Sequence, residues 1–393
     1  MKSGLRNSFL LVLFLVRFFF FSSQSFAEET TYHFNFEKGA YFGEMYHVAL
    51  GLLAEKNAYV YLPYISDSSD SISQEKLKQL EADPKARQAL IIYGFLKQIG
   101  LTNRVIQANS RIPPIDNKVF GLVGKERPDG TGKFVAPYVK PLAYSTQAFE
   151  RFIADDNEGN LKKAATLFTR SGTDPPDEVK KFIQDQITSK QANKKPLVAI
   201  WNRQDPSYQP ERNMSRETLA ALVKESITKG YTPMILGPPV DPSWVEFQEL
   251  ISQGDVLNMT ELWKKQPFNR WDTQVTGQLD LFRELKKNGG LIGQIGMKGG
   301  ALDGPAVAAG LPTIELVIPD DTKDDAANSR RILRFAHSIG NMTPLEVSPK
   351  GTVRNFYETA PANWIDLLNK PDALRRHCTL LYQFLSLRPK RLR

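Results

Sequence analysis

The sequence predicts an α/β protein that consists of two doubly wound halves behind an export signal. Apolar strands alternate with amphipathic helices along most of the chain. Glycine-containing turns follow a strand and precede a helix in each half, at 37–43 and again at 296–304. A polar, unpatterned segment at 190–196 comes directly before a new apolar strand. We therefore expect one Rossmann-like domain over 28–193 and a second over 194–393.

The first 27 residues have the composition of a secretory signal peptide. Lys2 and Arg6 give a positive start, and a Ser-Phe-Ala sequence ends at Ala27. Between them, 9–21 is apolar apart from Arg17 and is shorter than the roughly 20 residues of a membrane-spanning helix. We expect cleavage after Ala27 and a mature protein without a stable membrane span. It would be secreted or periplasmic in a bacterium, and lumenal to the Golgi or endoplasmic reticulum in a eukaryote.

Composition limits the chemistry that the rest of the chain can carry. Removing the expected signal lowers the formal charge from +8 to +5, because three basic residues and no acid are lost. That charge is too small to indicate a nucleic-acid partner. Cys378 is the only cysteine, which excludes an intramolecular disulfide and a thiolate metal cluster. The four histidines have no metal-ligand spacing. We expect no metal and no cofactor.

In the first half, a strand, a glycine turn, a helix and a second strand follow one another. Alternation at 31–36 predicts the first strand, and apolar residues at three- and four-residue spacings from Glu44 predict the helix. Parallel strands bind ligands at their carboxyl ends, so the turn at 39–44 is expected at a binding edge. Further expected elements are a strand over 58–63, a helix over 86–99, strands over 118–123 and 133–139, and two or three helices over 144–191.

The second half shows the same alternation more clearly. Leu197 to Trp201 is an unbroken apolar strand. Ser215 is the expected N-cap of a helix that reaches Lys229 and stops at Gly230. Strands are expected over 232–236, 255–258, 290–295 and 313–318, with helices over 279–288 and 305–309.

Four stretches together resemble a known family. They are GAYFGEMYHVALGLLAEKNAYVYLP in the first half and AIWNRQDPSYQPERNMSRETLAALVKESITKGYTPMILG, DVLNMTEL and GGLIGQIGMKGGALDGPAVAAGLPTIEL in the second. Their order is similar to that of GT-B glycosyltransferases, most nearly the heptosyltransferase type. The resemblance implies two Rossmann-like domains that face each other across a cleft. The first would bind the acceptor, and the second, with the C-terminal helices, would bind a nucleotide-sugar donor.

The resemblance also implies roles for individual residues. Glu44 falls where the family has a carboxylate at the first glycine loop, a position that suits a general base for the acceptor hydroxyl. Arg212 falls near the family's basic residue after the donor-domain strand. Arg203 suits the same diphosphate contact, at a strand end similar to the arginine motif of fucosyltransferases. Both roles have a structural alternative. Glu44 would be an acid that the helix dipole favours in the first turn of a helix, and Arg203 would form an ion pair with Asp205.

The loop at 296–304 departs from the family pattern. The family has Asp-Ser/Thr-Gly-x-x-His, whereas this chain has Lys298, Gly299 and Gly300, then Asp303 and Gly304, without a histidine. Three features of this loop suit a diphosphate. Its glycines allow close backbone approach, Lys298 adds a positive charge, and the N-terminus of the expected following helix lies next to the loop. We expect these residues to bind the donor. A tight strand-to-helix turn is the structural alternative.

Two hypotheses of different classes follow. The first is an inverting, metal-independent glycosyltransferase that acts on a glycan or protein acceptor and neutralises the departing diphosphate with basic side chains and helix N–H groups. The second is an exported GT-B-like protein that binds a glycan or nucleotide without catalysis. An epimerase or pyruvyl transferase of the same fold is a third candidate. The sequence does not predict the oligomeric state.

Overall fold

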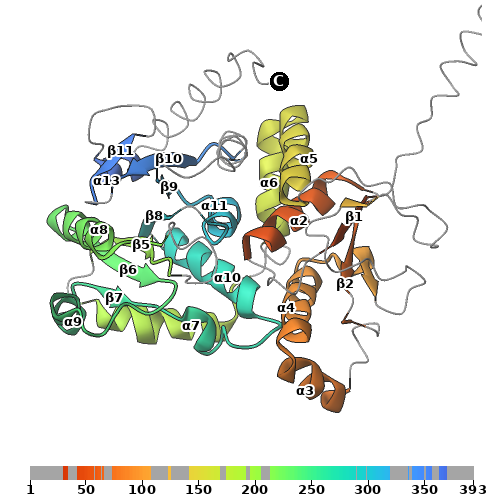
Figure 1. Ribbon diagram of the computed structural model, residues 1–393, viewed down its shortest axis with the longest axis horizontal. Coiled ribbons are helices and arrows are strands. Elements are labelled where there is room, and N and C mark those ends of the chain that lie inside the picture. The colour runs from red at the N-terminus through yellow and green to blue at the C-terminus, as the bar shows by residue number, and fades with distance from the viewer. Residues whose placement is uncertain are drawn as a thin grey trace, which may run out of the picture.

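The chain forms two β-sheets, with helices around and between them (Figure 1). The computed structural model describes residues 30–33, 42–56, 58–62, 64–65, 73–107, 123–124, 141–168, 174–191, 195–204, 213–288, 290–297, 299–318, 335, 339–348, 351–355 and 363–369. The expected signal at 1–27 and the expected strand at 133–139 lie outside these residues. Within them, no helix is long and apolar enough to cross a bilayer.

The first sheet has four strands in the order β3-β2-β1-β4. The first three are parallel, and β4 runs antiparallel to β1. The strands are β1 Thr30–His33, β2 Ala58–Leu62, β3 Val105–Gln107 and β4 Val123–Gly124. The helices of this region are α2 Phe42–Ala54, α3 Gln74–Ala82, α4 Pro84–Gln98, α5 Pro141–Asp155 and α6 Asn157–Leu167. A short helical turn, Thr102–Arg104, comes before β3.

The second sheet has seven strands in the order β11-β10-β9-β8-β5-β6-β7. All neighbours are parallel apart from β10 and β11. The strands are β5 Leu197–Trp201, β6 Thr232–Leu236, β7 Leu257–Asn258, β8 Leu291–Met297, β9 Thr313–Val317, β10 Met342–Val347 and β11 Val353–Asn355. The six parallel strands follow the 3-2-1-4-5-6 order of a Rossmann sheet, which switches direction between β5 and β8.

Helices cover both faces of this second sheet. They are α7 Asp177–Phe182, α8 Arg216–Thr228, α9 Val245–Ser252, α10 Gln274–Lys287, α11 Asp303–Ala308 and α13 Trp364–Leu368. Short helical turns are Ile183–Ile187, Thr188–Lys190 and Leu262–Lys264. Along β5, Val198 and Ile200 pack with α8, α9 and α13, whereas Leu197 and Ala199 pack with α7 and α10. The predicted α/β layering is therefore present in this region.

The core of the first region continues into the second. Side chains of α2, α4, α5 and α6 form one apolar cluster with side chains of α10 and α11. Figure 1 shows α4 beside α10 and α2 beside α11, as their contacts require. Helix α7 and the turns that follow it, within the half that the sequence places at 28–193, pack instead with the core of the second sheet. The two regions are therefore connected by a shared buried core as well as by the polypeptide chain.

Several element boundaries match the predicted ones because their local signals are strong. The strands β5 and β6 begin and end where expected. The Ser215 hydroxyl accepts the Thr218 N–H at 3.1 Å, and Gly230 has a φ of 83° after α8. In contrast, α10 begins at Gln274 instead of 279, and α11 begins at Asp303 instead of 305.

Candidate functional site

A cavity of about 500 Å³ lies at the carboxyl edge of the second sheet, where α2 and α4 approach it. Its walls come from the chain directly after β5, β6 and β8, from α10, and from α2 and α4 of the first region. The cavity therefore lies at the switch point between β5 and β8. Ligands of open α/β sheets bind in that crevice, and this volume is within the usual range for small-molecule sites.

Three of the residues that the sequence assigns to the donor line this cavity together. Arg203 follows β5, and Gly299 and Gly300 follow β8. The half-buried Arg203 is the one charged side chain among the lining residues that the structure describes. The Gly299 N–H donates to Glu315 Oε1 at 3.3 Å, so this N–H is directed into the protein. The positive charge that could face a diphosphate is that of Arg203, and its ligand role stays a prediction.

Asp303 and Gly304, which the sequence also assigns to the donor, lie outside the cavity lining. The buried Asp303 Oδ2 lies 2.8 Å from Nε2 of His47 on α2. A Cβ on Gly304 would overlap the ring of Tyr46, also on α2. Helix α11 has six residues and carries Asp303 in its first turn, so its positive end already has an internal counter-charge. These residues join α11 to α2.

The remaining predicted residues are placed only in part. Arg212 and Lys298 lie outside the described residues. Glu44 lies in the first turn of α2, between Gly43 and Met45, which both line the cavity. The side chain of Glu44 is outside the described part of the structure. The backbone therefore brings the predicted base to the edge of the cavity.

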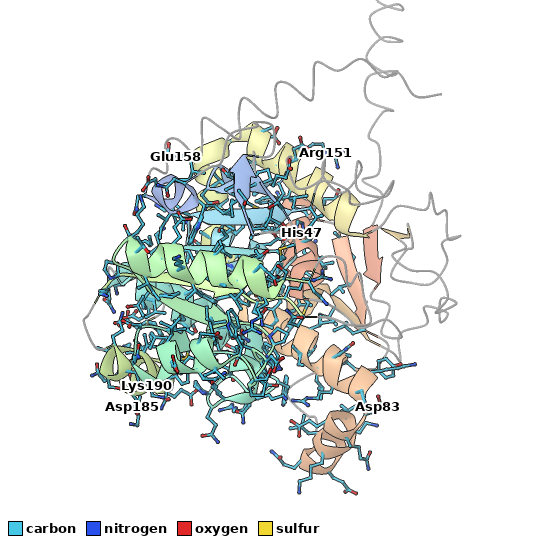
Figure 2. All side chains as sticks on the ribbon, turned by 60° about the vertical axis from the view of Figure 1, so that its left-hand side comes forward. His47, Asp83, Arg151, Glu158, Asp185 and Lys190 are labelled. Carbon is cyan, nitrogen blue, oxygen red and sulfur yellow. The ribbon has the colours of Figure 1, made fainter. Side chains whose placement is uncertain are left out.

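Two polar side chains of α2 are enclosed between the two regions. His47 is fully buried, with its ring 4.5 Å from that of Phe335, and Figure 2 shows it in the interior of the molecule. Tyr46 packs edge-on against Phe95 and Phe168. Burial and, next, the charge of Asp303 raise the pKa of Tyr46 far above its ordinary value. We therefore assign both side chains to packing, and Tyr46 stays neutral at physiological pH.

Two buried carboxamides hold the loops around the cavity. The Gln294 Oε1 accepts the Trp201 indole N–H at 2.9 Å, and Gln294 Nε2 donates to the carbonyl oxygen of Leu302 at 2.8 Å. Asn202 Nδ2 donates to the carbonyl oxygen of Pro238 at 3.1 Å. These bonds fix the three strand ends of the cavity relative to one another.

Sequence reasoning missed several polar residues at the site. Glu315 on β9 and Gln294 on β8 are buried beneath the loop after β8, and a polar residue within an apolar strand was the available signal. Gln88, Gln274 and Gln278 line the cavity. The last two lie in the first turns of α10, before the apolar spacing from which the helix was predicted. Among the described residues, no group of three or more His, Cys, Asp or Glu is placed to hold a metal ion.

Comparison with known proteins finds little. No protein-family model and no curated protein matches the chain. The chain is similar to the structure of ADP-heptose LPS heptosyltransferase II from E. coli, with 12% identity and a TM-score of 0.33, over 85% of this chain and 94% of that one. It is also similar to a glycosyl transferase family 9 structure from Veillonella parvula, with 11% identity and a TM-score of 0.35, over 88% and 95% of the two chains. TM-scores below 0.5 do not establish a common fold, so the architecture rests on the strand order described above.

Proposed function

We propose that this protein transfers a glycosyl group from a nucleotide-sugar donor to a glycan or protein acceptor. The observation that carries the proposal is the position of Arg203 in a cavity at the switch point of a Rossmann-ordered sheet. Nucleotides bind at that position in doubly wound folds, and a guanidinium there can pair with their phosphates. Trp201 and Trp263 also line the cavity and offer apolar faces to a base or a sugar ring.

The proposed mechanism is a single, inverting displacement. A carboxylate at Glu44 removes the proton of the acceptor hydroxyl, and that oxygen attacks the anomeric carbon on the face opposite the diphosphate. The bond from the anomeric carbon to the diphosphate breaks, and its electron pair leaves with the diphosphate. Arg203, with Lys298 and Arg212, would neutralise the developing negative charge without a metal. The acceptor would approach from the α2 and α4 side of the cavity.

Turnover of the donor tests this proposal. Residues 28–393 are incubated with ADP-glucose, GDP-mannose and UDP-glucose, and the release of nucleoside diphosphate is measured. Glu44→Gln should lower turnover by about 100-fold or more, because general-base catalysis contributes at least that much. Glu75→Gln is the matched control, since Glu75 is an exposed glutamate in the first turn of α3. Equal turnover of the two variants would remove Glu44 from the mechanism.

Binding without catalysis is the second candidate function. The Gly299 N–H donates to Glu315, so the loop has one backbone N–H fewer to offer a phosphate. This observation favours binding without catalysis. A protein that binds a nucleotide sugar and releases no nucleoside diphosphate from it, with or without added glycan, would support this candidate over the transferase.

We further propose that the protein is exported. The proposal rests on the basic start, the apolar run and the small residue at Ala27. Sequencing the N-terminus of the protein from the secreted or periplasmic fraction should give Glu28 as the first residue. A chain that still contains 9–21 would contradict cleavage.

A further inference from the structure

Three glutamines from two helices line the same cavity as Arg203. Gln88 comes from α4, and Gln274 and Gln278 come from the first two turns of α10. The exposed fractions of Gln274 and Gln278 are 6% and 7%. A carboxamide carries no charge and offers both hydrogen-bond donors and an acceptor. The side of the cavity formed by α4 and α10 is therefore polar and neutral, unlike the side that carries Arg203.

Gln274 has an unsatisfied hydrogen-bonding group. Its side-chain oxygen is buried and has no hydrogen-bond partner within the described part of the chain. The Gln278 Nε2 donates at 2.6 Å to the main-chain oxygen of Gln274, so this bond leaves the side-chain oxygen of Gln274 without a donor. A buried carbonyl without a donor is unfavourable, and few such groups occur in folded proteins. The terminal torsion of a glutamine is soft, so the carboxamide can turn to meet a ligand in the cavity.

We propose that Gln274, together with Gln88 and Gln278, binds the hydroxyl groups of a neutral sugar. This inference rests on the proposed function and identifies the transferred group as an uncharged sugar ring. Sugar hydroxyls donate to a carboxamide oxygen and accept from its nitrogen, so both partners are satisfied. A sugar carboxylate only accepts hydrogen bonds, and it would lose water on this side of the cavity without gaining an opposite charge from the three glutamines.

A stability comparison tests whether the Gln274 carboxamide lacks a structural partner. Gln274→Met keeps the approximate shape and removes the unsatisfied oxygen, so the melting temperature should stay unchanged or rise. Gln294→Met is the matched control, because Gln294 is also buried and makes three side-chain hydrogen bonds. This control should lower the melting temperature by roughly 5 °C. An equal fall in both variants would overturn the inference, since it would show that the protein itself satisfies Gln274.

A binding comparison tests the ligand. Isothermal titration calorimetry compares each nucleoside diphosphate with its sugar conjugates. The uridine set is UDP, UDP-glucose and UDP-glucuronate, and the other two sets are ADP with ADP-glucose and GDP with GDP-mannose. Wild type should bind a neutral sugar conjugate more tightly than its nucleoside diphosphate. Gln274→Met should bind the nucleoside diphosphate as wild type does and bind the conjugate about five- to twentyfold more weakly, the equivalent of one or two lost hydrogen bonds.

The outcomes separate this inference from the proposed function. If Gln274→Met binds conjugate and nucleoside diphosphate as wild type does, or weakens both equally, the sugar subsite is wrong and the nucleotide site stands. Wild-type preference for UDP-glucuronate over UDP-glucose would also overturn the neutral-sugar assignment. A wild-type protein that binds none of these compounds overturns the proposed function and this inference with it.

Discussion

Helix α2 meets the second sheet in two different ways. Three of its residues contact α11 or the loop before it: His47 bonds to Asp303, Tyr46 covers Gly304, and Gly43 contacts Gly300. We call these three contacts the inter-region lock. Gly43 and Tyr46, together with Met45, also line the cavity, so the lock and the cavity adjoin along α2. In the lock, the Asp303 carboxylate is paired with His47, whereas the cavity-lining Gln274 has a buried side-chain oxygen without a partner in the described structure.

The comparison shows that one glycine-rich loop serves two purposes. Gly299 lines the cavity, Gly300 lines the cavity and also belongs to the lock, and Asp303 and Gly304 lie in the lock alone. A motif that a sequence assigns as a unit to ligand binding is therefore divided by the fold. Substitutions in the lock should reduce stability, and substitutions at the cavity should reduce binding.

Breaking the buried contact between His47 and Asp303 in the lock should have the largest effect. Asp303→Ala removes the buried carboxylate that bonds to His47, and we expect a loss of about 3 kcal/mol in the free energy of unfolding, measured by urea denaturation. Asp272→Ala is the control, because Asp272 pairs with Arg270 at 2.7 Å at the surface and should cost under about 1 kcal/mol. The double variant His47→Ala/Asp303→Ala should lose little more than either single variant. Strictly additive losses would show that the two side chains are not coupled.

The two adjacent glycines provide a smaller and sharper test. A Cβ at Gly300 would overlap the backbone of Gly43, whereas a Cβ at Gly299 would have its nearest neighbour, the carbonyl oxygen of Met297, at 3.4 Å. Gly300→Ala should therefore lower the free energy of unfolding by about 1–3 kcal/mol through overpacking. Gly299→Ala should change it by less than about 1 kcal/mol. Equal melting temperatures for the two variants would contradict the close approach of α2 and the loop.

The sequence predicted the limits of β5 and β6 better than those of the short strands, for physical reasons. Strands such as 197–201 and 232–236 are buried on both faces, so an unbroken apolar run marks them. The two-residue strands β4 and β7 carry too little pattern for their limits to be predicted. The start of α10 was missed because its first turns are polar and line a cavity, so they lack an apolar face.

From the sequence, the candidate site could be located only by which residues follow the ends of buried strands. The position of Arg203 after a buried strand was sufficient to place it in the cavity. No pattern within 296–304 indicated that Asp303 would bond to His47, because their contact depends on the packing of two distant segments. Gln88 and Gln274 line the same cavity for a similar reason, because α4 packs against α10.

The central claim is that the cavity binds a nucleoside diphosphate through Arg203, and calorimetry on one pair of variants tests it most directly. Arg203→Ala and Arg216→Ala are titrated with whichever of ADP, GDP or UDP binds wild type most tightly. Arg216 is an exposed arginine of α8 that does not line the cavity. A charge-assisted phosphate contact is worth roughly 1.5–3 kcal/mol, so Arg203→Ala should bind about ten- to a hundredfold more weakly, and Arg216→Ala should bind as wild type does. Wild-type affinity in Arg203→Ala would contradict the account.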